Sequence, residues 1–186
     1  HQLPIDAITT AGFKWLCGPY GTGFCWITPQ VRQKLNYNQA YWVNMLSSAE
    51  LETTGELHIS KQNDASRYDV FGTANFFNFL PLAASIEHLL AVGIEKIQAY
   101  NSALVDKIVA GLDPTRYELI SPRTPQERSA LVVFSYKDRS QNRAIFETLL
   151  NQKIFLAFWK GNLRSAPHLY NTTQEIDKFL EILHAQ

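Results

Sequence analysis

A lysine near the start of the chain lies in an unusually apolar, glycine-rich stretch. Lys14 stands between Phe13 and Trp15, inside the segment Gly12–Gly23 with the sequence GFKWLCGPYGTG. Most lysines are exposed on protein surfaces, and a surface lysine beside a hairpin is the simplest interpretation. Apolar surroundings instead favour an uncharged amine, which is a nucleophile that forms an imine with an aldehyde. The stretch therefore indicates a candidate site for an aldehyde cofactor, of which pyridoxal 5'-phosphate (PLP) is the common one.

A second candidate is the segment Phe71–Asn75, with the sequence FGTAN, which precedes a long apolar run. Thr73 or Asn75 can serve simply as the N-cap of a helix. A hydroxyl at a helix N-terminus also suits a phosphate group, because the free N–H groups and the helix dipole both favour an anion. Thr73 is therefore a candidate phosphate ligand as well as a candidate cap.

The third candidate is an arginine in the segment Leu163–Thr172, with the sequence LRSAPHLYNT. Arg164 can be one more strand arginine in a surface ion pair. A guanidinium can also hold a carboxylate through two parallel hydrogen bonds. Enzymes that act on amino acids need such a group to orient the Cα–H bond of the substrate. Arg164 is therefore a candidate carboxylate-binding residue.

The surroundings of Lys14 resemble the PLP-lysine segment of the class V aminotransferase family. That pattern has an aspartate, a short strand, Lys-Trp-Leu, one residue, Gly-Pro, one residue and Gly-Thr-Gly-Phe; here Asp6 stands eight residues before Lys14. The resemblance implies that PLP is the cofactor and that Lys14 is its Schiff-base lysine. Many members have Ser and His where this chain has Ala11 and Phe13. Thr10 or backbone N–H groups are then expected to contact the cofactor phosphate.

The other two candidates also lie in segments that are similar to family motifs. Residues 67–75 resemble a stretch that ends in Gly-Thr, one residue and Asn, where the threonine contacts the cofactor phosphate of the neighbouring subunit. This implies a homodimer in which Thr73 completes the site of the partner chain. The run around Arg164 resembles the closing motif of the family. It implies that Arg164 holds the carboxylate of an amino-acid or keto-acid substrate.

The resemblance covers essentially the whole chain, but only the back half of a full-length family member. It implies an α/β fold, with the end of a fold-type I PLP-dependent transferase large domain over residues 1–112. A small α+β C-terminal domain is expected over residues 113–186. The aspartate that pairs with the pyridine nitrogen of PLP belongs to the other half, and without it the ring is a poor electron sink. We therefore expect activity to require a separate N-terminal half.

The family includes enzymes of transamination, racemisation or epimerisation, desulfuration and β-elimination. Its desulfurases have a cysteine on a loop shortly before the carboxylate-binding arginine, and no cysteine occurs here between Gln126 and Arg164. Sulfur transfer by that route is therefore not expected, whereas the remaining reactions stay open. A second interpretation also stays open, in which the chain is a non-catalytic remnant that keeps a dimerisation surface.

The elements around Lys14 are predicted from turn residues and apolar runs. Residues 1–28 are typical of short strands around a glycine-rich turn, and Phe24–Thr28 is expected to be a buried strand. Pro29 suits the first position of a short helix that ends near Leu35. Residues 36–70 are polar and long for a connector, which favours a functional loop or an interface segment.

The remainder of the chain is predicted to hold long helices followed by a compact α+β unit. The apolar residues of 76–112 have helical spacing, with a bend at Gly93. Before Gly93 they lie on nearly all sides of the expected helix, so this helix should be largely buried. Ser140 is expected to cap a later helix, and Thr172–Glu175 has the spacing of a capping box. The predicted order after these long helices is strand, strand, helix, strand, strand, helix.

Composition excludes several other classes of protein. Seventeen basic and seventeen acidic residues give a net charge of zero, which is not typical of nucleic-acid binding or of polybasic membrane binding. The histidines show no metal-ligand spacing, so no metal is expected. Cys17 and Cys25 fit neither a disulfide framework nor a zinc motif. We expect them to be reduced thiols that pack beside Lys14 in a cytoplasmic protein.

Overall fold

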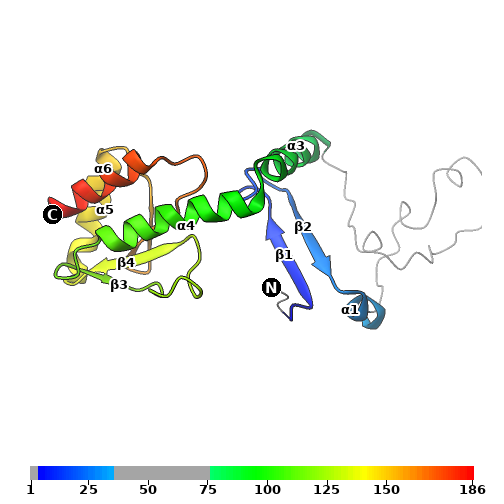
Figure 1. Cartoon of the computed structure of the whole chain (residues 1–186), viewed down its shortest axis with the longest axis horizontal. Coiled ribbons are helices and arrows are strands. Elements are labelled where there is room, and N and C mark those ends of the chain that lie inside the picture. The colour runs from blue at the N-terminus through cyan, green and yellow to red at the C-terminus, as the bar shows by residue number, and fades with distance from the viewer. Residues whose placement is uncertain (1–3, 36–75) are drawn as a thin grey trace, which may run out of the picture. The chain divides into compact units, whose positions relative to one another are not determined.

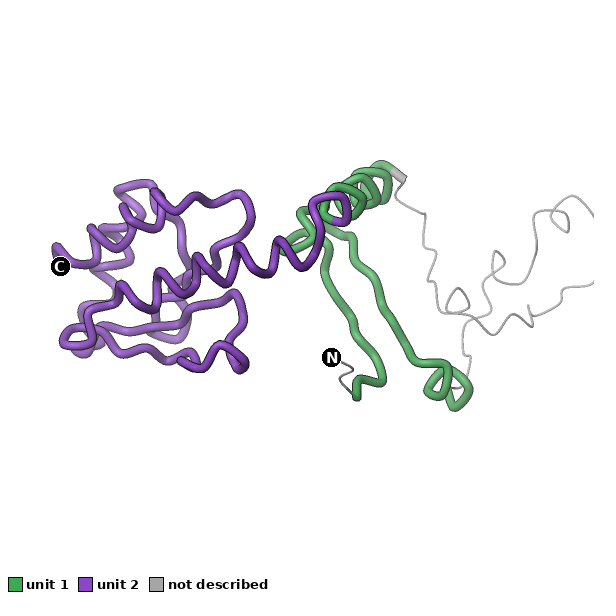
Figure 2. Tube along the Cα trace, in the orientation of Figure 1, with its two compact units in different colours: residues 1–89 green, residues 90–186 purple. Residues whose placement is uncertain are grey.

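The computed structural model describes residues 4–35 and 76–186 of the chain (Figure 1). The chain divides into two compact units, residues 1–89 and 90–186 (Figure 2). In the described ranges, unit 1 contains a two-stranded sheet and unit 2 a four-stranded sheet. The polar segment 36–70, for which we predict a functional loop or an interface, lies outside the described residues. The domain boundary after residue 112 stays a prediction.

Unit 1 begins with a pair of antiparallel strands, β1 (Ala7–Ala11) and β2 (Gly23–Ile27). Ile8 lies directly opposite Trp26 in this register. A β-branched residue facing an aromatic residue is a favourable cross-strand pair. The two strands and the glycine-rich connection between them agree with the prediction from the sequence.

The prediction that the second strand is buried is wrong for the described chain. Phe24 and Trp26 of β2 have exposed fractions of 49% and 47%. Neighbouring side chains of a strand point to opposite faces, so a strand is buried only when a layer covers its faces. The described part of unit 1 leaves both faces of the pair largely uncovered, and that explains the exposure of an apolar strand.

A short helix, α1 (Pro29–Lys34), follows the strand pair as predicted. The Thr28 hydroxyl accepts a hydrogen bond from the Val31 N–H, and proline stands at the start of the helix. Proline is favoured there because the first N–H groups of a helix have no partner within the helix. The local sequence is therefore sufficient to start α1.

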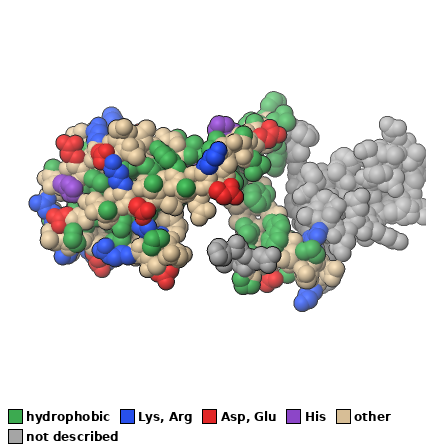
Figure 3. All heavy atoms as spheres, in the orientation of Figure 1, with side chains coloured by type: hydrophobic (Ala, Val, Ile, Leu, Met, Phe, Trp, Pro, Cys, Tyr) green, Lys and Arg blue, Asp and Glu red, His purple; other side chains and the backbone are tan. Residues whose placement is uncertain are grey.

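The helix α3 (Phe76–Val92) is also confirmed, but the prediction that it is largely buried is wrong. Phe77 and Leu80 have exposed fractions of 89% and 72%, and Figure 3 shows hydrophobic side chains gathered over this helix. Within the described ranges only part of the circumference of α3 is covered, although α3 is apolar on nearly all sides. Two leucines of α3 are buried, Leu82 and Leu89.

Gly93 ends α3, and α4 (Ile94–Gly111) follows at once, as predicted. The backbone of Gly93 has φ 98°, which glycine adopts without steric cost. No single helix in the described ranges is long and apolar enough to cross a membrane; α3 and α4 meet that test of length and composition only as a pair.

Unit 2 is an antiparallel sheet with helices packed on one face. The strand order is β3-β4-β6-β5, and every neighbouring pair is antiparallel. The element bounds are β3 (Tyr117–Leu119), β4 (Val132–Tyr136), α5 (Asn142–Asn151), β5 (Ala157–Trp159), β6 (Asn162–Ser165) and α6 (Thr173–His184). This is the predicted order of strand, strand, helix, strand, strand, helix.

One contiguous core joins α4, α5 and α6 to the sheet. Val132, Phe134 and Leu163 are fully buried on the sheet face that contacts the helices. The helices contribute an apolar stripe, as the sequence predicts for amphipathic helices. The buried residues of the helices are Leu104, Val105, Ile108, Ile145, Leu149, Ile176, Phe179, Leu180 and Leu183. This core fixes the sheet that carries Arg164.

The helix starts of unit 2 follow the prediction in one case and differ in the other. Thr172 and Glu175 form the predicted capping box at the start of α6. Ser140 is not a cap, because it lies inside a 3-10 turn, η3 (Arg139–Gln141), that precedes α5. Asp138 caps this turn and accepts hydrogen bonds from the N–H and the hydroxyl of Ser140 at 3.1 and 2.7 Å.

Candidate active site

Lys14 lies on a loop between β1 and β2 that is closed by backbone hydrogen bonds. The Gly12 N–H donates to the Thr22 carbonyl at 2.7 Å, and the Gly18 N–H donates to the Gly12 carbonyl at 2.8 Å. Within the loop, the Cys17 N–H donates to the Lys14 carbonyl at 3.0 Å. The backbone at Lys14 is therefore held in place although the residue is exposed.

Helix α3 fastens this loop from one side. The Ser85 hydroxyl donates to the Leu16 carbonyl at 2.6 Å, and the Asn78 side-chain amide donates to the Tyr20 carbonyl at 3.0 Å. These bonds fix the loop on both sides of Cys17, so the position of Lys14 depends on α3. The sequence pattern does not reveal either bond, because each joins residues far apart in the chain.

Close packing of Leu82 of α3 explains two glycines of the motif. A Cβ atom at Gly12 would lie 2.9 Å from a methyl group of Leu82 and 2.5 Å from the Thr22 hydroxyl oxygen. A Cβ atom at Gly18 would lie 2.6 Å from a methyl group of Leu82. Side chains at either position would push the loop away from α3. Glycine is therefore needed here for a close approach of two elements.

The side chain of Lys14 is not enclosed by apolar groups, in contrast to the expectation from its neighbours. Lys14 is exposed, and its Nζ lies 5.4 Å from the centre of the Phe13 ring, which stacks on Tyr20 at 4.5 Å. No carboxylate pairs with Lys14 within the described ranges. Among the residues that the structure describes, the amine is therefore accessible and forms no ion pair.

Of the two predicted phosphate ligands, Thr10 and Thr73, the structure describes only Thr10. Thr10 is half-buried on β1, and its hydroxyl makes only a long hydrogen bond to the adjacent Ala11 carbonyl, at 3.4 Å. This hydroxyl is therefore weakly held and can turn to another acceptor. Thr73 lies outside the described residues. The roles of both threonines stay predictions.

Arg164 lies on β6 in unit 2, opposite Val133 of β4 and Ala157 of β5. Its neighbour Leu163 points into the core, so the Arg164 side chain lies on the opposite face of the sheet. Arg164 is half-buried, and its guanidinium pairs with no carboxylate in the described part of the chain. A half-buried cation without a counter-ion suits the binding of an anion.

A buried asparagine holds the turn that precedes Arg164, and the sequence analysis did not identify it. The Asn142 amide nitrogen donates to the Ser135 hydroxyl at 2.8 Å and to the Gly161 carbonyl at 2.7 Å. Its amide oxygen accepts a hydrogen bond from the Tyr136 N–H at 2.8 Å. Asn142 is fully buried. A polar residue at a core position of α5 is the signal that could have revealed it.

The two cysteines are exposed in the structure, so the expectation that they pack beside Lys14 is wrong. Cys17 has φ 53°, a left-handed conformation imposed by the tight loop. No group of three or more His, Cys, Asp or Glu side chains in the described ranges is arranged to hold a metal ion. Lys14 belongs to unit 1 and Arg164 to unit 2.

The sequence matches the Aminotransferase class-V family over residues 1–179, and the chain belongs to that family. A probable cysteine desulfurase of Pyrococcus abyssi is 23% identical over 199 residues, which cover 98% of this chain and 47% of that protein. An isopenicillin N epimerase of Streptomyces clavuligerus is 22% identical over 192 residues, which cover 99% of this chain and 48% of that protein. The family resemblance found in the sequence is confirmed.

Solved structures show the same fold. A cystine C-S lyase in complex with its product cysteine persulfide has a TM-score of 0.80 and 23% identity, over 97% of this chain and 46% of that chain. A mutant of that lyase has been solved with glycine covalently linked to its PLP cofactor. This chain therefore has the predicted α/β fold of fold-type I PLP enzymes, and it spans about half the length of the relatives it matches.

Proposed function

We propose that this chain supplies the Schiff-base lysine and the carboxylate-binding arginine of a PLP-dependent enzyme that acts on an amino acid. The observation that carries the proposal is the exposed amine of Lys14, which forms no ion pair within the described ranges and stands on a braced loop in a chain of the class V family. An aldehyde cofactor requires an amine that it can reach, and Lys14 meets this requirement. When bound, PLP supplies a reactive aldehyde and an electron-withdrawing ring.

Lys14 would hold the cofactor through its amine, and the braced loop limits where that amine can lie. With substrate bound, the same amine would be the general base that accepts the proton from the substrate Cα. A weakly held hydroxyl at Thr10 is available as a phosphate donor. The hydrogen bonds from Ser85 and Asn78 restrict the motion of the loop. Such restriction favours a productive geometry for proton transfer.

Arg164 is proposed to bind the α-carboxylate of an amino-acid or keto-acid substrate. Its guanidinium has no ionic partner in the described ranges and is half-buried, so a carboxylate would gain charge-assisted hydrogen bonds without displacing an existing pair. Replacement by lysine would keep the charge but lose the two parallel hydrogen bonds. Arg164 therefore orients the substrate rather than taking part in bond breaking.

We also propose that activity requires an N-terminal half, as the length of the relatives suggests. The strand pair β1–β2 supports this proposal, because two short strands with uncovered faces are only marginally stable in water. Phe24 and Trp26 of β2 and Phe77 of α3 expose large apolar surfaces that such a half could cover. A homodimer, in which Thr73 reaches the partner's cofactor, and a cytoplasmic location belong to the same proposal.

The proposal covers transamination, epimerisation and lyase chemistry, and the similarity to an epimerase and to a cystine C-S lyase supports the last two. Both cysteines of the chain precede residue 26. The segment shortly before Arg164, where the desulfurases of the family have their cysteine, therefore contains none. The proposal therefore does not include sulfur transfer through such a cysteine.

The test is to co-express the chain with its N-terminal half and to record PLP content and turnover of a panel of amino acids. We expect a visible absorption band that is lost in Lys14→Ala and kept in the control Lys34→Ala. Arg164→Lys should keep the band but raise KM for the substrate about tenfold or more, because the paired hydrogen bonds to the carboxylate are lost. A colourless assembly that takes up no PLP would instead favour a non-catalytic dimerisation module.

A further inference from the structure

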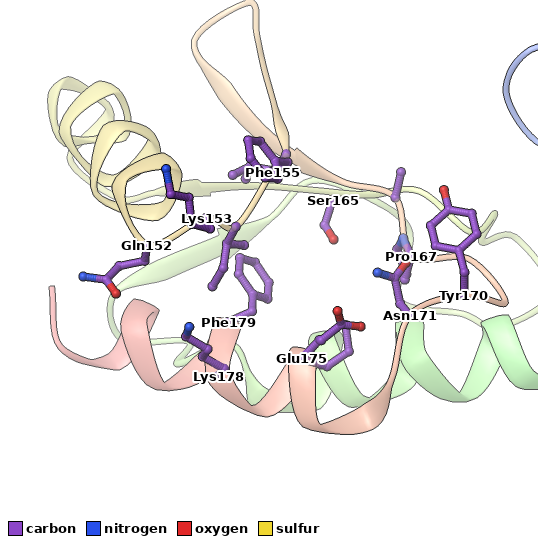
Figure 4. A pocket seen from close by; sticks show the side chains of 14 residues that line it. Gln152, Lys153, Phe155, Ser165, Pro167, Tyr170, Asn171, Glu175, Lys178 and Phe179 are labelled. Atoms are coloured by element: carbon purple, nitrogen blue, oxygen red, sulfur yellow. The ribbon is translucent and has the colours of Figure 1, made fainter.

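Unit 2 contains a cavity of about 480 Å³ between the end of α5, strand β6 and the first turns of α6 (Figure 4). Its size falls within the range of small-molecule sites. Its walls combine apolar and polar side chains, and Phe155, Ile176 and Phe179 are among the apolar ones. Ser165, which also lines the cavity, lies on the same face of β6 as buried Leu163. The cavity is therefore on the opposite face of the sheet from Arg164.

Two lysines stand at one end of this cavity. Figure 4 shows Lys153 and Lys178 at that end, with Tyr170 and Asn171 at the other and Phe179 between them. Neither lysine pairs with a carboxylate in the described part of the chain. Asp177, the neighbour of Lys178 in sequence, is engaged by Lys107 at 2.6 Å. The two ammonium groups therefore have no ionic partner of their own among residues 4–35 and 76–186.

The carboxylate that lines the cavity, that of Glu175, already accepts hydrogen bonds within the cap of α6. A Glu175 oxygen accepts hydrogen bonds from the N–H and the hydroxyl of Thr172, at 2.7 and 3.3 Å. The backbone hydrogen bond from Thr172 is the main cause that lowers the pKa of Glu175, so this carboxylate stays charged and committed to the helix cap. Two lysines and one glutamate leave the lining with an excess of one positive charge.

We propose that this cavity binds a small organic anion, a carboxylate attached to an apolar body. The carboxylate would lie at the end of the cavity where Lys153 and Lys178 stand, and the apolar body would contact Phe179 and Phe155. Charge complementarity selects an anion over a cation or a neutral molecule of the same shape. The apolar wall selects a body of several carbon atoms over a bare anion such as acetate. This site is distinct from the residues assigned to PLP and substrate, so it does not depend on the proposed function.

The probe for this site is octanoate, with octylammonium and octanol as matched ligands of opposite and zero charge. Titration calorimetry of the purified chain should show saturable binding of octanoate and at least about tenfold weaker binding of the other two, from the loss of charge-assisted contacts. Exposed apolar side chains of unit 1 attract all three ligands alike, so the difference between ligands isolates the cavity.

Variants then locate the site. Lys153→Glu and Lys178→Glu should each weaken octanoate binding, whereas Lys137→Glu, an exposed lysine outside the cavity, should leave it unchanged. Phe155 is 80% exposed, so Phe155→Ser tests the apolar wall without disturbing the core. Far-UV circular dichroism confirms that each variant is folded. The proposal is overturned if octylammonium binds as well as octanoate, if octanoate does not bind, or if Lys137→Glu weakens binding as much as the cavity variants.

Discussion

Replacing Asn142 should destabilise unit 2 and loosen the turn that precedes Arg164. Asn142→Ala removes three hydrogen bonds at once and leaves the Tyr136 N–H, the Ser135 hydroxyl and the Gly161 carbonyl without this partner. Each buried polar group left unsatisfied costs about 1–3 kcal/mol, and the three are not fully additive, so we expect a loss of about 3–5 kcal/mol. This is a large fraction of the stability of an ordinary domain, about 5–15 kcal/mol.

The assay is urea unfolding of the chain followed by circular dichroism. With a slope of about 2 kcal/mol per molar urea, the expected loss lowers the unfolding midpoint by roughly 1.5–2.5 M. The exposed residue Asn151, at the other end of the same helix, provides the control Asn151→Ala, for which we expect a change within about 0.5 kcal/mol.

A second variant separates hydrogen bonding from cavity formation. Asn142→Asp keeps the volume and the acceptor for the Tyr136 N–H, but it places a carboxylate oxygen where the amide donated to the Gly161 carbonyl. We expect this variant to be destabilised about as strongly as Asn142→Ala. If Asn142→Asp unfolds like the wild type, the hydrogen-bond explanation is refuted and only packing matters at this position.

Three further substitutions test other parts of the account. Gly23→Ala should break the β1–β2 pairing, because the new Cβ would collide with the Thr10 carbonyl; the check is faster cleavage of residues 4–35 by limited proteolysis. Tyr117→Phe loses the hydrogen bond to the Leu183 carbonyl (2.9 Å) and about 1 kcal/mol. Burial raises the pKa of Tyr117 from 10.0 to about 12. The unfolded chain therefore loses this proton first, and the wild type, but not Tyr117→Phe, should lose stability as the pH rises from 10.0 to about 12. Thr172→Ala removes the N-cap of α6 and should cost about 1 kcal/mol in urea unfolding.

Each of these expectations has a contrary result. Unchanged proteolysis of Gly23→Ala would mean that the strand pair tolerates a side chain there. A Tyr117→Phe chain with the same alkaline stability profile as the wild type would show that folding does not raise the pKa of Tyr117. An unaltered urea midpoint for Thr172→Ala would show that the capping box contributes little to α6.

Local sequence signals were sufficient for the elements of unit 2. The capping box at Thr172, the apolar stripe of α6 and the glycine break at Gly93 each depend on residues that are close in the sequence. Such signals report local backbone preferences directly. Ser140 was misassigned because Asp138, two residues earlier, is an equally good cap and accepts the hydrogen bonds instead.

Burial in unit 1 could not be predicted in the same way. An apolar strand such as β2 and an apolar helix such as α3 indicate buried surfaces, but the sequence does not state which segment covers them. Phe24 and Phe77 are exposed because no described layer lies over them. The motif around Lys14 located the loop correctly, whereas its fastening by Ser85 depends on a contact across 69 residues of chain.

The central claim is that the amine of Lys14 bonds PLP in the full assembly of this chain with its N-terminal half. The direct measurement is borohydride reduction in the presence of PLP, followed by peptide mapping by mass spectrometry. The account predicts one stable pyridoxyl adduct, on the peptide that contains Lys14, with Lys34 unmodified. An adduct spread over several surface lysines, or a full yield of adduct in Lys14→Ala, would contradict it.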